Sequence, residues 1–320
     1  MSALTHLRRA ATLSLLSLAA VFAAPQPARP ADPLRIGFQL SSTLAAILKT
    51  NGLLEQELAR QGVAVTWHEF TSGLPQLEAL NTGNIDFSAD VADTVPLFAL
   101  AAGAKLTYVA EEAASAQAQG ILVPAKSQIK AIVDLKGKKI AVTKGAGSHY
   151  LLIAALQSVG LTFRGIVPAY LTPSDGRAAF VGERVDAWVA WDPYLTTAER
   201  QDSRRLLIDG QGLASYKRFY LASQRYVLAH GDVLKVVYDK LDATGRWVRS
   251  NPAEAAAILA PLWHIDRHIV EEVLRHRSYL VGPVTREGLV EQEKIGAAFF
   301  SEGLLPRQID GSEAEIWRPD

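Results

Sequence analysis

From residue 34 onward, short apolar runs alternate with segments in which apolar residues recur every three or four positions. The short runs predict strands, and the helical spacing predicts helices. Glycines such as Gly62, Gly83 and Gly160 come directly after helical segments, where they favour the end of a helix. This repeated alternation of strands and helices predicts an α/β fold with mostly parallel sheets flanked by helices.

The elements fall into two α/β runs followed by a helical tail. In the first run, strands are expected at 34–38, 63–70, 85–88 and 105–110, and helices at 43–50, 53–60, 74–82 and 94–102. In the second, strands are expected at 121–123, 139–143, 166–170, 185–190 and 204–208, and helices at 129–135, 149–159, 173–181 and from 192 onward. Residues 219–222 are interpreted as a return crossing, and the tail helices are expected at 232–250, 252–262, 266–275 and 286–302.

The N-terminal segment has the pattern of a secretory signal. Residues 1–9 carry two arginines and no acid, residues 10–24 are apolar apart from three hydroxyl residues, and prolines follow at once. This pattern predicts a signal peptide at 1–23, with cleavage as late as 31 as the alternative. The rest of the chain has no second apolar stretch long enough to cross a membrane, so we expect a soluble, exported protein.

Composition narrows the function classes. The chain has 320 residues, of which 33 are basic and 33 acidic, so its formal net charge is zero. A nucleic-acid-binding protein would carry a basic excess, so we expect no nucleic-acid partner. Cysteine is absent, which excludes disulfides, thiolate nucleophiles and cysteine-ligated metals.

Candidate binding residues lie in the loops after the predicted strands. Ligands of parallel α/β sheets bind beyond the carboxyl ends of the strands. Several of these loops are rich in Ser, Thr and Gly and lead directly into helices, whose free N–H groups and dipoles favour anions. The candidates are Gln39, Ser41, Ser42, Thr43, Thr71, Ser72, Gly73, Gly145, Ala146, Gly147, Ser148, His149, Trp191 and Asp192.

The segment 144–149, KGAGSH, is the sharpest of these loops. Its two glycines allow a ligand to approach the backbone, and Ser148 adds a hydroxyl donor. An ordinary glycine-rich turn between strand and helix explains the pattern equally well. Tyr150 stands where the dinucleotide fingerprint needs glycine, and the phosphate-loop pattern is missing.

The other candidate loops also have plain structural interpretations. Gln39 with 41–43, and the segment 71–73, can be simple helix caps. Trp191 can line a ligand or belong to the core, with Asp192 capping the following helix.

Two charged pairs or runs are expected to be solvated. Glu111 and Glu112 come where the chain leaves the first run, and their alternative role is to meet a cationic group of a ligand. The basic run 275–277 is expected to be an exposed helix end.

The sequence predicts no catalytic residues, metal ligands or cofactor. His264 and His268 stand four apart, but Ile265 replaces the glutamate of the zinc-protease pattern. Ser148 and His149 are adjacent, whereas a nucleophile and its base meet from separate segments.

Seven segments, in order, resemble the substrate-binding proteins of bacterial ABC importers for aliphatic sulfonates, within a group that also includes taurine- and nitrate-binding proteins. They are LRIGFQ (34–39), LEALNTGNIDF (77–87), VDLKGKKIAV (133–142), KGAGSH (144–149), YLTPSDGRAAF (170–180), VDAWVAWDPY (185–194) and FYLAS (219–223).

The resemblance implies a two-lobed periplasmic binding protein of type II, each lobe a mostly parallel sheet flanked by helices, joined by two crossing hinge strands. Lobe 1 is then 33–121 plus 223–320, and lobe 2 is 122–222. The ligand is expected in the cleft between the lobes, where the sulfonate meets the backbone and hydroxyl groups of 147–149. Gln39 and Thr43 are expected to face it, and Trp191 to line the site.

The implied function is the capture of alkanesulfonates and their delivery to a permease driven by an ATPase subunit, for sulfur uptake. We expect a monomer that carries out no chemistry. The alternatives are a binding protein for taurine, nitrate or a thiamine precursor, and a ligand-sensing module for a signalling partner. A desulfinase of this fold would need a cysteine, which the chain lacks.

Two departures from the pattern bear on the ligand. Ala146 stands where serine is common in the glycine-rich loop. The segment 89–93 replaces a loop rich in hydroxyls and adds the carboxylates of Asp90 and Asp93.

Overall fold

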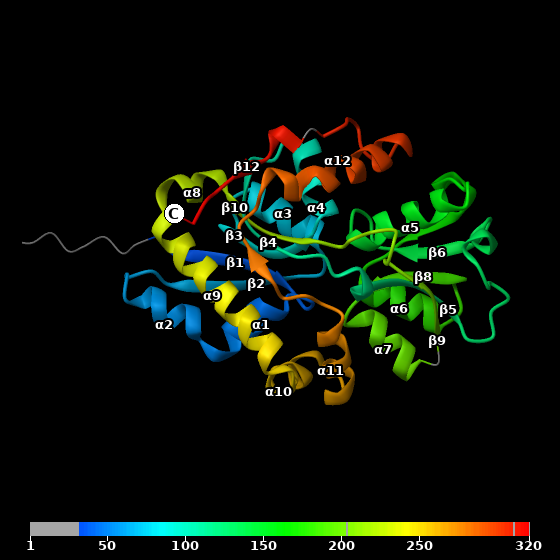
Figure 1. Ribbon diagram of the computed structural model, residues 1–320, viewed down its shortest axis with the longest axis horizontal. Coiled ribbons are helices and arrows are strands. Elements are labelled where there is room, and N and C mark those ends of the chain that lie inside the picture. The colour runs from blue at the N-terminus through cyan, green and yellow to red at the C-terminus, as the bar shows by residue number, and fades with distance from the viewer. Residues whose placement is uncertain (1–31, 203, 310, 320) are drawn as a thin grey trace, which may run out of the picture. The chain divides into compact units, whose positions relative to one another are not determined.

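The computed structural model describes residues 32–202, 204–309 and 311–319. Within this part, the strands are β1 Leu34–Gln39, β2 Val65–Phe70, β3 Phe87–Ala92, β4 Leu106–Glu112, β5 Gln119–Pro124, β6 Lys139–Val142, β7 Val167–Tyr170, β8 Ala187–Trp191, β9 Arg204–Asp209, β10 Arg218–Ser223, β11 Val281–Gly282 and β12 Glu315–Ile316. They form a first sheet in the order β11-β4-β10-β3-β1-β2, with β12 on β4, and a second in the order β7-β6-β8-β5-β9 (Figure 1).

Helices cover both faces of each sheet. The helices that follow the strands are α1 Thr43–Asn51, α2 Leu53–Ala59, α3 Gly73–Asn81, α4 Thr94–Ala101, α5 Gly147–Ser158, α6 Pro173–Val181 and α7 Tyr194–Gln201. The C-terminal helices are α8 Gln224–Ala229, α9 Gly231–Ser250, α10 Pro252–Trp263, α11 Arg267–Arg275 and α12 Arg286–Ser301. On the first sheet, α1 and α9 pack on one face and α3, α4 and α12 on the other (Figure 1). On the second sheet, α5 covers one face and α6 and α7 the other.

Each sheet has three parallel strands at one end and antiparallel pairs beside them. In the first sheet, β1 runs parallel to β2 and β3, whereas β10 runs antiparallel to β3 and β4. In the second, β6 is parallel to β7 and β8, and β5 is antiparallel to β8 and β9. The α/β class and the sheets flanked by helices are therefore confirmed, and both sheets are mixed because the chain returns through antiparallel strands.

One hydrophobic cluster runs continuously between helices of the two sheets. Phe299 of α12 contacts the ring of His149 at the start of α5, with 5.0 Å between ring centroids, and also packs against Phe98 and Tyr150. On the opposite face of the first sheet, a second cluster joins α1, α9 and α10. The shared cluster anchors α5 against elements of the first sheet, which fixes where its N-terminus lies.

The chain changes sheet twice, at 113–118 and at 210–217. These two linkers are hydrogen-bonded to each other: the Ser115 N–H donates to the Ser215 carbonyl at 2.9 Å and the Gly210 N–H to the Ala116 carbonyl at 3.1 Å. Both changes fall a few residues before the predicted lobe boundaries at 121 and 222. The division into lobes itself stays a prediction.

Two sequence expectations need correction. The strand expected at 85–88 begins at Phe87 and continues to Ala92, so most of the expected loop at 89–93 is strand. The expected crossing at 219–222 is β10, which lies in the middle of the first sheet. All six residues of β10 are buried, because helices cover both faces of the sheet there. A short apolar run of this kind does not show from sequence alone whether it pairs inside a sheet or crosses between sheets.

Smaller differences concern the ends of elements and the leader. Only Ile132–Leu135 of the helix expected at 129–135 is helical, as a 3-10 turn. The predicted signal at 1–23 lies outside the described residues. None of the helices that the structure describes is both long and apolar enough to span a bilayer.

Candidate functional site

The glycine-rich segment of the second sheet packs directly against the carboxyl edge of the first. A Cβ atom at Gly147 would lie 2.4 Å from Cε2 of Tyr216 and 3.0 Å from Cβ of Ala92, at the end of β3. Gly145, with φ of +70°, faces Leu74 of α3, only 2.7 Å from where its Cβ would stand. Such close approaches require glycine. The loops after β3, β2 and β6 therefore meet, as expected.

Uncommitted hydrogen-bond donors lie at the N-terminus of α5. Among the described residues, the backbone N–H groups of Gly147 and Ser148 form no hydrogen bond. The hydroxyl of Ser148 is completely buried and has no partner there either. A buried hydroxyl without a partner costs free energy, so this cluster of donors is suited to an anionic ligand.

His149 supports the loop instead of offering a charge. Its Nδ1 accepts a hydrogen bond from the Gly145 N–H at 3.1 Å, and its own backbone N–H donates to the Ala146 carbonyl at 2.9 Å. The ring packs among Phe163, Tyr170 and Phe299. Burial, assisted by the charge of Lys144, lowers the pKa of His149 to about 3, so the imidazole is neutral.

The loop after β1 is closed by its own hydrogen bonds. The Gln39 backbone N–H donates to Oγ of Ser42 at 3.1 Å, and its side-chain amide donates to the Asp90 carbonyl at 3.4 Å. The hydroxyl of Thr43 lies 3.5 Å from that of Tyr279. The buried side chains of Gln39, Ser42 and Thr43 thus fix the shape of the loop that leads into α1.

Arg277 is the centre of a buried charge network beneath this loop. Its Nη2 donates to Asp90 Oδ2 at 2.7 Å and to Glu112 Oε1 at 2.6 Å, while Nε donates to Glu112 Oε2 at 3.1 Å. Its Nη1 donates to the Ser41 carbonyl at 2.8 Å. Burial alone would lower the pKa of Arg277, but the charges of Asp90 and Glu112 outweigh it and hold that pKa well above its usual value.

These contacts correct two expectations of solvated charge. Glu112 is completely buried, and Arg277, from the basic run 275–277, is 8% exposed. The chain after α11 turns inward over the sheet, so the run does not end in solvent. Glu111 is partly buried and lies 3.5 Å from the ammonium of Lys217.

Arg218 connects this network to the glycine-rich segment. Its Nη1 donates to Asp90 Oδ2 at 2.6 Å and its Nη2 to the Tyr216 hydroxyl at 3.0 Å. The Arg218 guanidinium also lies over the Tyr216 ring, 4.9 Å from the centroid, and that ring covers Gly147. Burial raises the pKa of Tyr216 to about 12, so the phenol stays neutral and can accept from Arg218.

The remaining candidates lie around the same edge. Trp191 is buried and meets Tyr194 edge to face, with centroids 6.0 Å apart. Asp192 Oδ1 accepts from the Thr196 backbone N–H at 3.0 Å in the first turn of α7, although the N-cap residue of this helix is Pro193 and not Asp192 as expected. Its Oδ2 lies 2.7 Å from Nδ1 of His276.

The side chains of the loop 71–73 make few hydrogen bonds, so the loop borders this edge mainly through its backbone. Thr71 is exposed, and Ser72 precedes α3 without a side-chain cap bond. Gly73 is buried against Val95, whose Cγ2 would lie 2.8 Å from an added Cβ.

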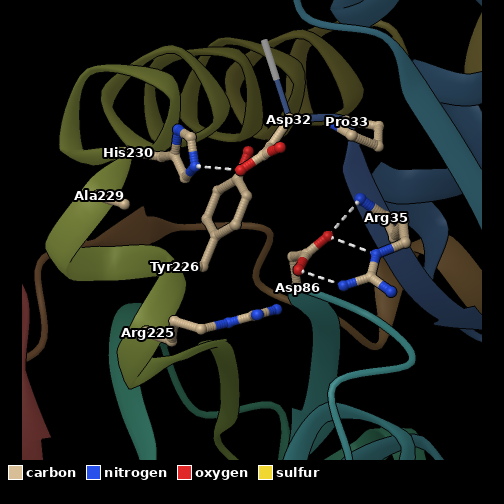
Figure 2. A pocket seen from close by; sticks show the side chains of 8 residues that line it. All are labelled: Asp32, Pro33, Arg35, Asp86, Arg225, Tyr226, Ala229 and His230. Carbon is tan, nitrogen blue, oxygen red and sulfur yellow. Dashed lines mark hydrogen bonds and ion pairs between the residues drawn. The ribbon is translucent and has the colours of Figure 1, made fainter.

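Two cavities lie at opposite ends of the strands, and their positions bear on where a ligand binds. One, of about 380 Å³, lies at the carboxyl ends of strands from both sheets. Its lining is Leu40, Glu69, Phe70, Thr71, Thr172, Pro173, Ser174 and Tyr194. Another, of about 320 Å³, lies at the amino end of β1 (Figure 2), where Arg35 binds Asp86 through two guanidinium nitrogens at 2.7 and 2.8 Å. In this cavity Asp86 is already paired with Arg35, and the cavity lies at the opposite end of the strands from the glycine-rich segment, so it is the weaker candidate.

Sequence reasoning missed the buried charges that organise the site. Asp90 was noted only as an added carboxylate in a loop, and Arg218 and Tyr216 were not considered. A signal does exist: Asp90 lies within the largely apolar segment of β3, Glu112 ends β4 and Arg218 begins β10, and a charge in a covered strand needs a buried partner.

The described residues include no group of three or more His, Cys, Asp and Glu side chains that could hold a metal ion. The residues that meet at this edge are amide and hydroxyl donors and a buried set of charges that pair with one another.

The fold is that of the periplasmic binding proteins, and several solved structures share it. Residues 58–255 match the NMT1/THI5-like family, and a protein of Escherichia coli K12 named for binding aliphatic sulfonates is 37% identical over 98% of both chains. The chain therefore belongs to the NMT1/THI5-like family and, within it, to the aliphatic sulfonate-binding proteins.

Two solved structures are particularly similar. The alkanesulfonate-binding protein SsuA from Xanthomonas axonopodis pv. citri, bound to MOPS, is 38% identical, with a TM-score of 0.84 over 91% of this chain and 100% of its own. The periplasmic aliphatic sulphonate-binding protein SsuA from Escherichia coli is also 38% identical, with a TM-score of 0.80 over 89% of this chain and 97% of its own.

Proposed function

We propose that the protein is the periplasmic solute-binding component of an ABC importer and captures aliphatic sulfonates for delivery to the membrane permease and its ATPase subunit. It acts as a monomer and catalyses no reaction. The similarity to sulfonate-binding proteins over nearly the whole chain supports this function. The absence of cysteine removes the nucleophile that a desulfinase of this fold would need.

The chemistry of a sulfonate matches the donors of α5. A sulfonate is a permanent monoanion with three acceptor oxygens and no proton to donate. Neutral N–H and O–H donors at a helix N-terminus satisfy such a group without a cationic side chain. Micromolar binding needs about 8 kcal/mol, and charge-assisted hydrogen bonds contribute about 1.5–3 kcal/mol each before the cost of association is subtracted.

The observation that carries the proposal is the donor cluster at Gly147 and Ser148. Two backbone N–H groups and one buried hydroxyl lie together, and none of them has a hydrogen-bond partner among the described residues, so together they suit one anion. In this proposal the sulfonate oxygens take those hydrogen bonds, while Trp191 and the loop after β1 line the cleft. The alkyl chain then adds about 0.8 kcal/mol for each buried methylene.

Calorimetric titration of the mature protein tests the function. The panel contains ethanesulfonate, butanesulfonate, octanesulfonate, taurine, nitrate and sulfate, with a thiamine precursor as a further alternative ligand. We expect micromolar binding of at least one alkanesulfonate and weaker binding of nitrate and sulfate. If no sulfonate binds, the proposed function is wrong.

A pair of serine variants connects binding to the site. Ser148→Ala removes the unpartnered hydroxyl and is expected to weaken butanesulfonate binding about tenfold. Ser158→Ala, at the other end of α5, removes a hydroxyl that donates to the Ala155 carbonyl and should leave affinity unchanged. Equal affinities of the two variants would show that the Ser148 hydroxyl does not contact the ligand.

A further inference from the structure

The helices α7 and α11 lie side by side although they belong to different sheets (Figure 1). Leu195 and Ala198 of α7 belong to a cluster of the second sheet, whereas Val270, Val273 and Leu274 of α11 belong to a cluster of the first. The buried apolar side chains of the two helices thus pack into separate cores. The side-chain bonds that join one helix to the other are between charged and polar groups.

Two ion pairs cross from α7 to α11. Nε of Arg200 on α7 donates to Oε2 of Glu272 on α11 at 2.9 Å, and Nη2 donates to Oε1. One turn further along, Nδ1 of His276 lies 2.7 Å from Oδ2 of Asp192, which comes just before α7. The side chains of Arg200 and His276 are 51% and 24% exposed, so water reaches both pairs. Such pairs can break and form again while both cores stay folded.

Between α12 and α5, in contrast, the two sheets are joined by ring contacts. Phe299 of α12 packs against His149 and Tyr150 of α5 within one continuous hydrophobic cluster. Separating α12 from α5 would expose apolar surface to water, whereas separating α7 from α11 exposes charged groups that water solvates. The contact of α7 with α11 is therefore the one that opens more easily.

The pair of His276 with Asp192 joins segments that lead directly into the candidate site. Asp192 follows Trp191 in the chain, and His276 precedes Arg277, which donates to the Ser41 carbonyl in the loop after β1 at 2.8 Å. The pair thus connects the end of β8 in the second sheet with the loop after β1 in the first. A ligand held between these segments leaves more slowly while the pair is intact.

On the basis of the proposed function, we propose that the two pairs, Arg200 with Glu272 and His276 with Asp192, form a latch that holds the sheets together around the sulfonate and slows its release. The latch makes no contact with the ligand. It raises the affinity by stabilising the arrangement of the two sheets in which the ligand is bound. Breaking it should therefore act mainly on the dissociation rate.

Protonation of His276 sets the strength of the latch. The carboxylates that act on His276 are Asp192 and Glu199 from the side of α7 and Glu272 from α11, and the nearby cations that act on Glu272 are Arg200 and Arg275. The hydrogen bond to Asp192 raises the pKa of His276, so the latch is strongest at low pH and weakens as the pH rises through that pKa. The sulfonate has no proton to lose in this range.

Charge variants test the latch. Dissociation of butanesulfonate is measured by stopped-flow fluorescence for wild type, Arg200→Glu and the exchange Arg200→Glu with Glu272→Arg. The matched control is Arg177→Glu, because Arg177 donates to Asp202 at 2.9 Å between α6 and α7, which both lie on the second sheet. We expect Arg200→Glu to release the ligand about fivefold faster than wild type, and the exchange to restore the wild-type rate. Arg177→Glu should stay within about twofold of wild type.

His276→Gln tests the dependence on pH. Between pH 5.5 and pH 9, we expect dissociation from wild type to become about threefold faster and dissociation from His276→Gln to change less. Burial raises the pKa of Asp93 to about 7, so Asp93 titrates in the same range, but it is present in both proteins and does not contribute to their difference. The same pH dependence in both proteins would refute the role of His276.

The outcomes separate the latch from the proposed function. If butanesulfonate binds but Arg200→Glu releases it no faster than Arg177→Glu, or if the exchange does not restore the rate, the latch is refuted and the proposed function stands. If wild type binds no alkanesulfonate at all, the proposed function is refuted and the latch with it.

Discussion

Tyr216 lies so close over Gly147 that a methyl group on the glycine would meet its ring carbon Cε2 at 2.4 Å. The two residues come from different parts of the fold: Tyr216 from the linker before β10, and Gly147 from the first turn of α5. Because Arg218 binds the Tyr216 hydroxyl, the ring cannot move aside without breaking a buried hydrogen bond. The contact places the donor cluster of α5 against the first sheet.

Gly147→Ala should therefore disturb both packing and binding. We expect the free energy of unfolding to fall by about 1–3 kcal/mol, as for other overpacked sites, and butanesulfonate affinity to fall at least tenfold. Urea unfolding and calorimetry measure these effects. Gly165→Ala is the control, since no atom lies within 4 Å of its added Cβ. Equal behaviour of the two variants would contradict a tight contact.

Arg277→Met should be strongly destabilising, because it leaves Asp90 and Glu112 with fewer buried partners. Removing one partner of a buried ion pair costs about 3–5 kcal/mol. The control, Arg246→Met, breaks an exposed pair with Asp242 on α9 and should cost less than about 1 kcal/mol. Urea unfolding measures the loss of unfolding free energy in both variants. If Arg277→Met loses no more than Arg246→Met, the buried charge network does not stabilise the fold.

The pair of His276 with Asp192 predicts a pH dependence of stability. The hydrogen bond that protonated His276 donates to Asp192 raises the pKa of His276; burial opposes this, and the charges of Asp192, Glu272 and Glu199 raise that pKa further, so the net shift is upward. Since the folded pKa is above the unfolded value of about 6.5, the stabilisation is complete below that pH. It is lost as the pH rises through the folded pKa.

His276→Gln tests this dependence. At pH 5.5, we expect the variant to be less stable than wild type by about 1–2 kcal/mol, the size of a hydrogen bond to a charged group. At pH 9 the difference should be clearly smaller. Urea unfolding at both pH values measures it, and a difference that does not change with pH would show that the imidazolium does not contribute.

Asp93 should make the folded protein less stable as the pH rises, whereas most carboxylates make it more stable. Burial, with the nearby charge of Glu291, raises its pKa to about 7, although the Lys217 N–H donates to it. The folded protein therefore keeps a proton that the unfolded chain loses above about pH 4, so stability falls as the pH rises from about 4 to 7.

Asp93→Asn should remove this fall in stability between about pH 4 and pH 7. Asparagine can still accept from the Lys217 N–H and donate to the Thr94 hydroxyl. We compare the free energy of unfolding of the variant with that of wild type at two pH values. The difference in favour of the variant should be larger at pH 8 than at pH 4.5 by up to about 4 kcal/mol. Asp239→Asn, in an exposed pair with Lys235, is the control and should show little change. A parallel pH dependence of Asp93→Asn and wild type would contradict the raised pKa.

Local patterns in the sequence were sufficient for most elements. The prediction of a helix at 173–181 agrees with α6, because Thr172 caps it and Pro173 begins it. Capping and periodicity depend on near neighbours in the chain, so they can be read from the sequence. The continuation of β3 to Ala92 depends on pairing with β10, more than a hundred residues later, and local patterns do not contain that information.

The same distinction holds for the candidate site. The glycines and serine of 145–148 could be chosen because their residue types suit a helix N-terminus that binds anions. Arg277 could not, because its partners Asp90 and Glu112 are distant in sequence and meet it only in the folded chain. Its apparent position at a solvated helix end was the reasonable local interpretation, and tertiary packing overrides it.

The central claim is that the donors at the start of α5 bind the sulfonate head. A crystal structure of the mature protein with butanesulfonate tests it most directly. We predict sulfonate oxygens within about 3 Å of the Gly147 and Ser148 N–H groups and of the Ser148 hydroxyl. Sulfonate density elsewhere, such as in the cavity beside Arg35 and Asp86, with these three donors bound to other protein groups, would contradict the account.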